Sequence, residues 1–219
     1  MDTTLNNIEV RVLGSLIEKE LTTPEYYPLS LNSLTNACNQ KSNRDPVAVL
    51  TEEDVVRALD SLRFKQFVVL SADGGRVSKY RHLLAEKLGL MPAELAVLCE
   101  LLVRGPQTTG ELRTRGERMY PFGDLAAVEE VLQELIQREN PLITLMPRQP
   151  GRKEGRYAQL FSALPECGEE NSEHRPEAAR LRVVAENDRI AKLEEEVAAL
   201  RDEVAGLQQM MTAFKAQFE

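Results

Sequence analysis

The sequence predicts a mainly helical protein with small β-hairpins: two tandem winged helix-turn-helix domains followed by a C-terminal coiled-coil helix. Three observations lead to this fold class: an apolar helical stripe that occurs twice, a β-like hairpin after each copy, and a heptad pattern near the C-terminus. The expected boundaries are residues 1–90 and 91–165 for the winged-helix domains, 166–177 for a linker and 178–219 for the coil.

The first helix of each copy carries the clearest internal match. At an offset of 85 residues, the runs 8–16 and 93–101 share a glutamate and three apolar positions with the spacing of one helix face. Pro92 precedes the second run and suits a first helical turn, where its missing N–H costs nothing. These runs therefore predict equivalent helices.

Two further helices are expected in each copy. The second helix starts near Ser30 in one copy, and in the other it follows the capping-box sequence Thr108–Glu111. The third helix begins after Thr51 in the first copy and at Asp124 in the second, and its apolar residues follow the same 4-then-3 spacing both times.

A β-hairpin is predicted after each third helix. The runs 67–70 and 77–82 flank a turn signal in the first copy, and the runs 142–145 and 156–161 flank another in the second. Tyr80 and Tyr157 occupy matching places in the returning strands. Three helices followed by a hairpin is the layout of a winged helix-turn-helix.

A heptad pattern follows the polar linker. β-Branched or methionine residues alternate with leucines at the two seam positions, and flanking charges are complementary, which favours a parallel homodimer. A helix that folds back on its own domains is the alternative. The predicted dimerisation residues are Val183, Ile190, Leu193, Val197, Leu200, Val204, Leu207, Met211 and Phe214.

Composition limits the function classes. The chain has 27 basic and 35 acidic residues, a net charge of -8, which argues against a uniformly basic nucleic-acid-binding protein. No run approaches the ~18 apolar residues of a membrane span, and the start of the chain has no secretory pattern, so no membrane association is expected. Three widely spaced cysteines predict no disulfide framework and a cytoplasmic location.

The sequence contains no recognisable catalytic or metal-binding motif. Gly105 and Gly110 have the spacing of a phosphate loop, but Glu111 and Leu112 stand where lysine and serine or threonine are needed. The two histidines, His82 and His174, lack neighbours with metal-ligand spacing and are interpreted as packing or surface residues. We therefore expect no catalytic residue, metal, cofactor or small-molecule ligand.

The third helices are unusual for groove-reading helices because their outward faces are acidic. Those faces carry Glu53, Arg57, Asp60 and Phe64 in the first copy, and Glu130, Gln133, Glu134 and Gln137 in the second. Such carboxylates repel phosphates.

Positive charge gathers instead on the wings and in one loop. The candidate nucleic-acid-binding residues are Arg76, Lys79, Arg81, Arg148, Arg152, Lys153, Arg156, Lys41 and Arg44. Arg113, Arg115 and Arg118 on or after the second copy's second helix are further cations that could hold phosphates. Two alternatives stay open: the wing cations protect sheet edges from pairing, and the loop 39–45 is held by its own amide-to-backbone bonds.

The runs 21–29 and 36–47 are distinctive, and the latter reads Asn-Ala-Cys-Asn-Gln-Lys-Ser-Asn-Arg-Asp-Pro-Val. Together with the runs 79–82, 104–108, 111–113 and 147–151, they make the chain similar to the bacterial YceH family through about Phe161. The resemblance implies tandem winged-helix domains, in agreement with the internal repeat. It implies no known activity, ligand or partner, so no functional residue is carried over.

Two function classes remain, and analogy of fold places the first slightly ahead. The first is a DNA-binding regulator, favoured by the fold and the basic wings; the alternative is a protein-interaction adaptor, favoured by the acidic third helices and the net charge.

Overall fold

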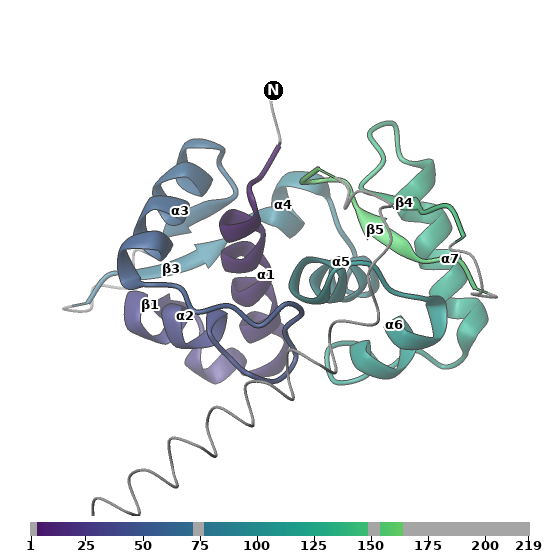
Figure 1. The fold of residues 1–219 in the computed structure, drawn as a ribbon, viewed down its shortest axis with the longest axis horizontal. Coiled ribbons are helices and arrows are strands. Elements are labelled where there is room, and N and C mark those ends of the chain that lie inside the picture. Colours follow the sequence, from purple (N-terminus) through teal and green to yellow (C-terminus); the bar gives the residue numbers. More distant parts are fainter. Residues whose placement is uncertain (1–3, 72–76, 149–153, 164–219) are drawn as a thin grey trace, which may run out of the picture. The chain divides into compact units, whose positions relative to one another are not determined.

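The computed structural model describes residues 4–71, 77–148 and 154–163 (Figure 1). Residues 1–166 form one compact unit. The predicted linker and coiled coil, and the predicted wing residues Arg76, Arg152 and Lys153, lie outside the described residues. None of the helices in the described part is long and apolar enough to cross a membrane.

The first repeat contains three helices and a small three-stranded sheet. Its elements are α1 (Asn7–Thr22), β1 (Leu29–Ser30), α2 (Leu31–Cys38), α3 (Glu52–Phe64), β2 (Val68–Leu70) and β3 (Lys79–His82). A 3-10 turn (Pro24–Tyr26) precedes β1, and a short helix α4 (Leu84–Leu88) leads to the second repeat.

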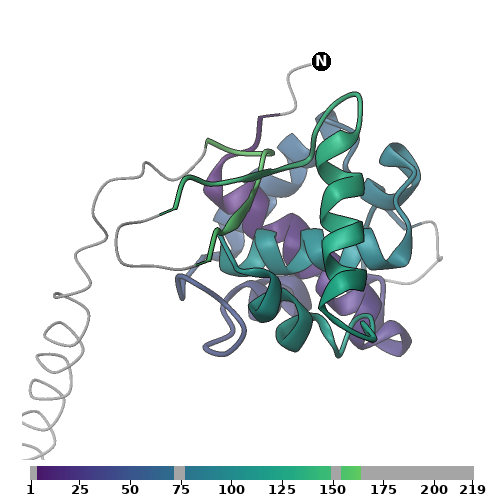
Figure 2. The same ribbon diagram turned by 90° about the vertical axis from the view of Figure 1, so that its right-hand side faces the viewer.

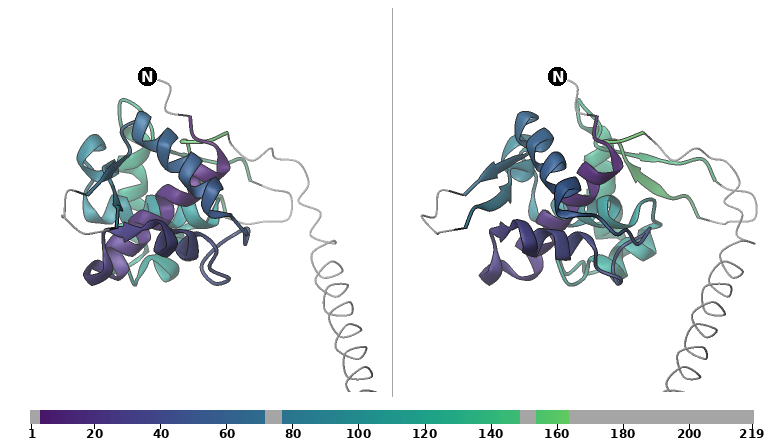
Figure 3. Two further views of the ribbon diagram at one scale, coloured as in Figure 1. Left: turned by 90° about the vertical axis from the view of Figure 1, so that its left-hand side faces the viewer. Right: turned by 60° about the vertical axis from the view of Figure 1, so that its left-hand side comes forward.

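The second repeat follows the same order with one strand fewer. Its elements are α5 (Pro92–Arg104), α6 (Thr109–Gly116), α7 (Leu125–Gln137), β4 (Ile143–Leu145) and β5 (Tyr157–Gln159). The prediction of a mainly helical protein with small antiparallel sheets is confirmed for the described residues. The two hairpins extend from the helices in different directions (Figure 3).

Side-chain caps start the helices at the residues that the sequence indicates. Thr108 and Glu111 form the predicted capping box of α6, and Thr51 forms another with Asp54 at the start of α3. The Asp124 carboxylate accepts the Ala127 N–H at 2.8 Å and caps α7. Each cap satisfies backbone donors that the first helical turn leaves without partners.

The two sheets match in register. In the first repeat the strand order is β1-β3-β2, and Tyr80 lies opposite both Leu29 and Leu70. In the second repeat β4 pairs with β5, and a single bridge between Gln107 and Tyr157 takes the place of the β1–β3 pairing. The predicted correspondence of Tyr80 and Tyr157 is therefore confirmed, whereas the sequence did not reveal the two-residue strand β1.

The centre of the unit is the crossing of α1 and α5 (Figures 1 and 2). Every residue from Glu9 to Glu18 and from Glu94 to Val103 is buried. A Cβ on Gly14 would lie 2.8 Å from Val103 Cγ1, so only glycine allows this close approach. The Cys99 thiol donates to the Gly14 carbonyl at 3.5 Å, and these two residues are separated by the repeat offset of 85. The helices thus cross at equivalent positions of the two repeats.

Candidate functional site

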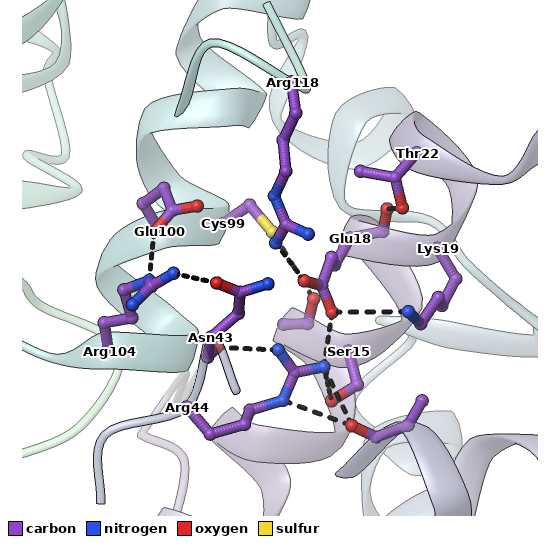
Figure 4. A network of polar contacts seen from close by, with 12 residues as sticks. Ser15, Glu18, Lys19, Thr22, Asn43, Arg44, Cys99, Glu100, Arg104 and Arg118 are labelled. Atoms are coloured by element: carbon purple, nitrogen blue, oxygen red, sulfur yellow. Dashed lines mark hydrogen bonds and ion pairs between the residues drawn. The ribbon is translucent and has the colours of Figure 1, made fainter. Parts of the chain in front are cut away.

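A buried carboxylate joins the two repeats (Figure 4). Glu18, on α1, is fully buried and accepts a hydrogen bond from Arg44 on one oxygen and from Arg118 on the other. Arg44 belongs to the loop between α2 and α3, and Arg118 follows α6. A single side chain of the first repeat therefore binds cations from both repeats.

Arg44 lies inside the protein and not on its surface. Its guanidinium donates to Glu18, to the Ala37 carbonyl at 2.8 Å and to the Asn43 carbonyl at 2.8 Å, and the residue is only 5% exposed. The sequence suggested a phosphate contact here. Because these internal acceptors already occupy the guanidinium, we leave Arg44 out of any nucleic-acid surface.

Hydrogen bonds hold the loop between α2 and α3 at several points. The Asn39 amide accepts from Leu50 N–H and donates to the Leu50 carbonyl, both at 2.8 Å, which supports the alternative of a loop held by its own amide-to-backbone bonds. The loop is also held from outside, because Asn43 accepts from Arg104 on α5 and Asp45 N–H donates to the Val103 carbonyl at 3.1 Å. The run that the sequence singled out is thus a connector between the repeats.

The pKa values of the two buried glutamates at this junction shift in opposite directions. Burial alone would raise the pKa of Glu18, but the hydrogen bond and charge of Arg44 and the charge of Arg118 outweigh it and lower that pKa. Burial raises the pKa of Glu100, whose partner Arg104 has its Nε 2.8 Å away. Neither Glu100 oxygen has a well-aligned hydrogen bond, so the ionised form of this carboxylate is less favourable.

An ion pair between the end of the third helix and the start of the first helix occurs at equivalent positions in both repeats. Lys65, at the end of α3, binds Glu9 at 2.8 Å, and Arg138, at the end of α7, binds Glu94 at 2.9 Å. Both glutamates also cap the first helix of their repeat. Each third helix is therefore fixed to its first helix by the same device.

His82 is a packing residue. Its Nδ1 accepts from Leu84 N–H at 3.2 Å and its Nε2 faces the Glu20 carboxylate, while the His82 amide donates to the Tyr27 hydroxyl at 2.7 Å. Because Nδ1 is bonded to a backbone amide and Nε2 is buried against a carboxylate, this histidine is not placed as a general base for a nucleophile. Burial also raises the pKa of Cys99, which disfavours a reactive thiolate.

In the part of the chain that the structure describes, no three metal-ligating side chains gather.

Helices α3 and α7 lie on opposite sides of the α1–α5 crossing (Figure 1). All eight predicted outward residues are exposed: Glu53, Arg57, Asp60, Phe64, Glu130, Gln133, Glu134 and Gln137. Arg57 is 3.7 Å from Glu53 and is thus paired on its own helix. Phe64 is 91% exposed, an unusual position for a large aromatic side chain.

The predicted nucleic-acid-binding cations are scattered and partly neutralised. Lys41, Lys79 and Arg148 are exposed. Arg81 lies 2.7 Å from Glu86, and Arg156 donates to the Pro106 carbonyl at 2.7 Å and lies 3.3 Å from Glu111.

The cations around α6 are likewise engaged within the protein. Arg113 donates to the Gly123 carbonyl at 3.1 Å and Arg115 to the Gln107 side chain at 2.8 Å, while Arg118 binds Glu18. The sequence shows that these three residues are positively charged, but it does not show that they bind acceptors within the protein.

Residues 5–152 match the model of a protein family described as "Protein of unknown function, DUF480". The chain belongs to this family. The UPF0502 protein of Geotalea daltonii is 71% identical over 219 residues, and that of Geobacter sulfurreducens is 63% identical, each covering 100% of both chains. The YceH resemblance is confirmed, since YceH proteins are the same group.

Proposed function

We propose that this DUF480 member is a non-enzymatic adaptor, built from two fused winged-helix units, that contacts other proteins through its third helices. The order α1-β1-α2-α3-β2-β3, repeated in the second half with a bridge in place of the first strand, supports the winged-helix assignment. Each third helix would then occupy the position of a recognition helix.

The observation that carries the proposal is the chemistry of the two outward faces. On α3, the exposed aromatic ring of Phe64 shares its helix face with Asp60, Arg57 and Glu53. On α7, glutamates and glutamines occupy the corresponding face. Exposed aromatic residues anchor protein interfaces, whereas carboxylates oppose the approach of a phosphate backbone.

DNA binding is the second candidate, and a specific observation favours it. Lys79 and Arg148 are exposed beside the two hairpins, where a wing contacts the DNA backbone. Because Arg44 is buried against Glu18, Arg156 donates to the Pro106 carbonyl and Arg81 lies in a surface ion pair with Glu86, we rank this function second.

One experiment separates the two functions. Fluorescence anisotropy of random duplex and genomic fragments, titrated with the full chain from ~50 to ~200 mM salt, measures phosphate contacts. The adaptor proposal predicts no saturable binding at the low-salt end. Tight binding that disappears when the second wing's cations are changed to alanine would replace the adaptor proposal with the DNA function. Those cations are Arg148, Arg152, Lys153 and Arg156.

A positive test probes the α3 face directly. A photo-crosslinking amino acid at Phe64 should capture a protein in native cells, because that side chain projects into solvent. The matched control places the same group at Phe67, which is 1% exposed and next to α3. Equal crosslinking at both positions, or none at Phe64, would contradict the proposal.

A further inference from the structure

We propose that the segment Val47–Val49 is an edge to which a partner protein adds an extended, apolar and basic peptide as a β-strand. This inference rests on the proposed adaptor function, since it names the kind of partner, but it places the contact in the α2–α3 loop and not on the α3 face.

The segment is held at both ends. Before it, the Pro46 carbonyl accepts from Arg11 Nη2 at 2.6 Å, and Asp45 N–H is bonded to α5. After it, Leu50 is bonded through both its N–H and its carbonyl to the Asn39 side chain. The intervening residues form no helix, turn or bend, so the chain runs between these two anchors without a sharp change of direction.

The backbone between these anchors has unused hydrogen-bonding groups. Within the described part of the chain, the amides and carbonyls of Val47, Ala48 and Val49 make no hydrogen bond. A row of such groups on an extended segment is the template that β-strand addition uses.

The side chains of this segment also suit a strand. Val47 is 54% exposed and Val49 is 90% exposed, and Ala48 between them is half-buried. β-Branched residues at alternate positions favour extended pairing and project toward the same face, where a partner's apolar side chains can cover them.

Charge identifies the partner as a basic peptide. The segment runs directly into the first turn of α3, which carries three carboxylates: Glu52 and Glu53 are exposed, Glu53 lying 3.7 Å from Arg57, and Asp54 caps the helix. A lysine or arginine in the added strand would lie near these carboxylates. A second copy of this chain would bring the same three carboxylates and is therefore less suitable as the occupant.

The test uses the full chain and a synthetic nine-residue peptide of alternating valine and lysine as the probe. Hydrogen exchange should show new protection of the Val47–Val49 amides when the peptide is present, and anisotropy gives its affinity. Val49→Pro removes one amide donor and should weaken peptide binding at least about tenfold. Val49→Thr keeps the donor and the β-branched shape, and should change the affinity less than about threefold.

Several outcomes would overturn the proposal. Equal binding by the proline and threonine variants, with both folded by thermal melt, would exclude backbone pairing at this edge. A peptide with glutamate in place of lysine that binds equally well would refute the charge argument. Protection that rises with protein concentration without peptide would assign the edge to a second copy. The Phe64 crosslinking test does not involve this loop. A negative result for strand addition at Val47–Val49 would therefore leave the test of the adaptor proposal unaffected.

Discussion

Replacing Glu18 with glutamine should destabilise the protein far more than the same change at Glu100, although both side chains are fully buried. Glu18 neutralises Arg44, whose guanidinium has no access to solvent. Glu100 pairs with Arg104, which retains 16% side-chain exposure and can be hydrated in the variant. The two substitutions are chemically identical, so any difference between their effects on stability comes from the surroundings of the two side chains.

The magnitude follows from what each change leaves behind. Removing one partner of a buried ion pair costs about 3–5 kcal/mol because the other charge stays desolvated. Arg118 can turn to water, so the loss at Glu18 arises mainly from Arg44, and we expect about 3 kcal/mol. For a unit of this size, that corresponds to a fall in melting temperature of roughly 6–12 °C. Glu100→Gln should leave stability within about 1 kcal/mol of the wild type or raise it.

The pH dependence gives an independent check. The folded-state pKa of Glu18 is lowered from its ordinary 4.5, so its contribution is present above that value and is lost as pH falls below it. The folded-state pKa of Glu100 is raised, so its ionised form costs stability at neutral pH, and this cost is relieved as pH falls from that folded pKa to the ordinary 4.5. The difference between wild type and Glu100→Gln should therefore shrink on acidification before the Glu18 difference does.

Equilibrium urea unfolding of the full chain at several pH values, with thermal melts in parallel, measures both effects. Equal losses for the two variants at pH 7 would show that burial and not pairing decides stability at this junction. A Glu100→Gln variant that loses about 3 kcal/mol would mean that Glu100 is stabilised as an anion, contrary to the direction of its pKa shift.

Three further predictions concern the repeats and the coil. Gly14→Ala should cost up to about 2 kcal/mol in urea unfolding because its Cβ would crowd α5, whereas Gly110→Ala, with open space around its Cβ, should stabilise by up to about 1 kcal/mol. Lys65→Ala and Arg138→Ala should lower the free energy of unfolding in urea by similar amounts, about 1–3 kcal/mol each, and strongly unequal losses would contradict their equivalence. Removing residues 178–219 should convert a dimer into a folded monomer by sedimentation equilibrium, and a full-length monomer at micromolar concentration would refute the coil dimer.

The sequence predicted those elements that depend on local chemistry. The caps at Thr51, Thr108 and Asp124 follow from side chains that reach backbone donors three residues away, so a short window of sequence contains the whole interaction. The apolar stripes of the third helices likewise lie within single helices, and their buried faces match. β1 was missed because two residues are too few to show an alternating pattern.

The buried junction could not be predicted in the same way, because its contacts join residues far apart in the chain. Arg11, Ser15 and Glu18 follow a 4-then-3 spacing on α1, which in isolation is typical of a polar, solvent-facing stripe. The α2–α3 loop covers that stripe, with Arg44 reaching Glu18 across 26 positions and Arg118 reaching it across 100. Charge alone did not show whether Arg44 faces a phosphate or a carboxylate.

The positions of these charges also show that several of the chain's arginines are paired with buried carboxylates. Arg44 and Arg118 are bound to Glu18, Arg104 lies against Glu100, and Arg138 is bound to Glu94. A cation that is already paired with a buried carboxylate must lose that partner before it can hold a phosphate, and breaking such a pair costs several kcal/mol. These paired arginines are thus less available to nucleic acid, whereas the exposed valines of the loop and Phe64 on α3 need lose no ion-pair partner when a protein binds.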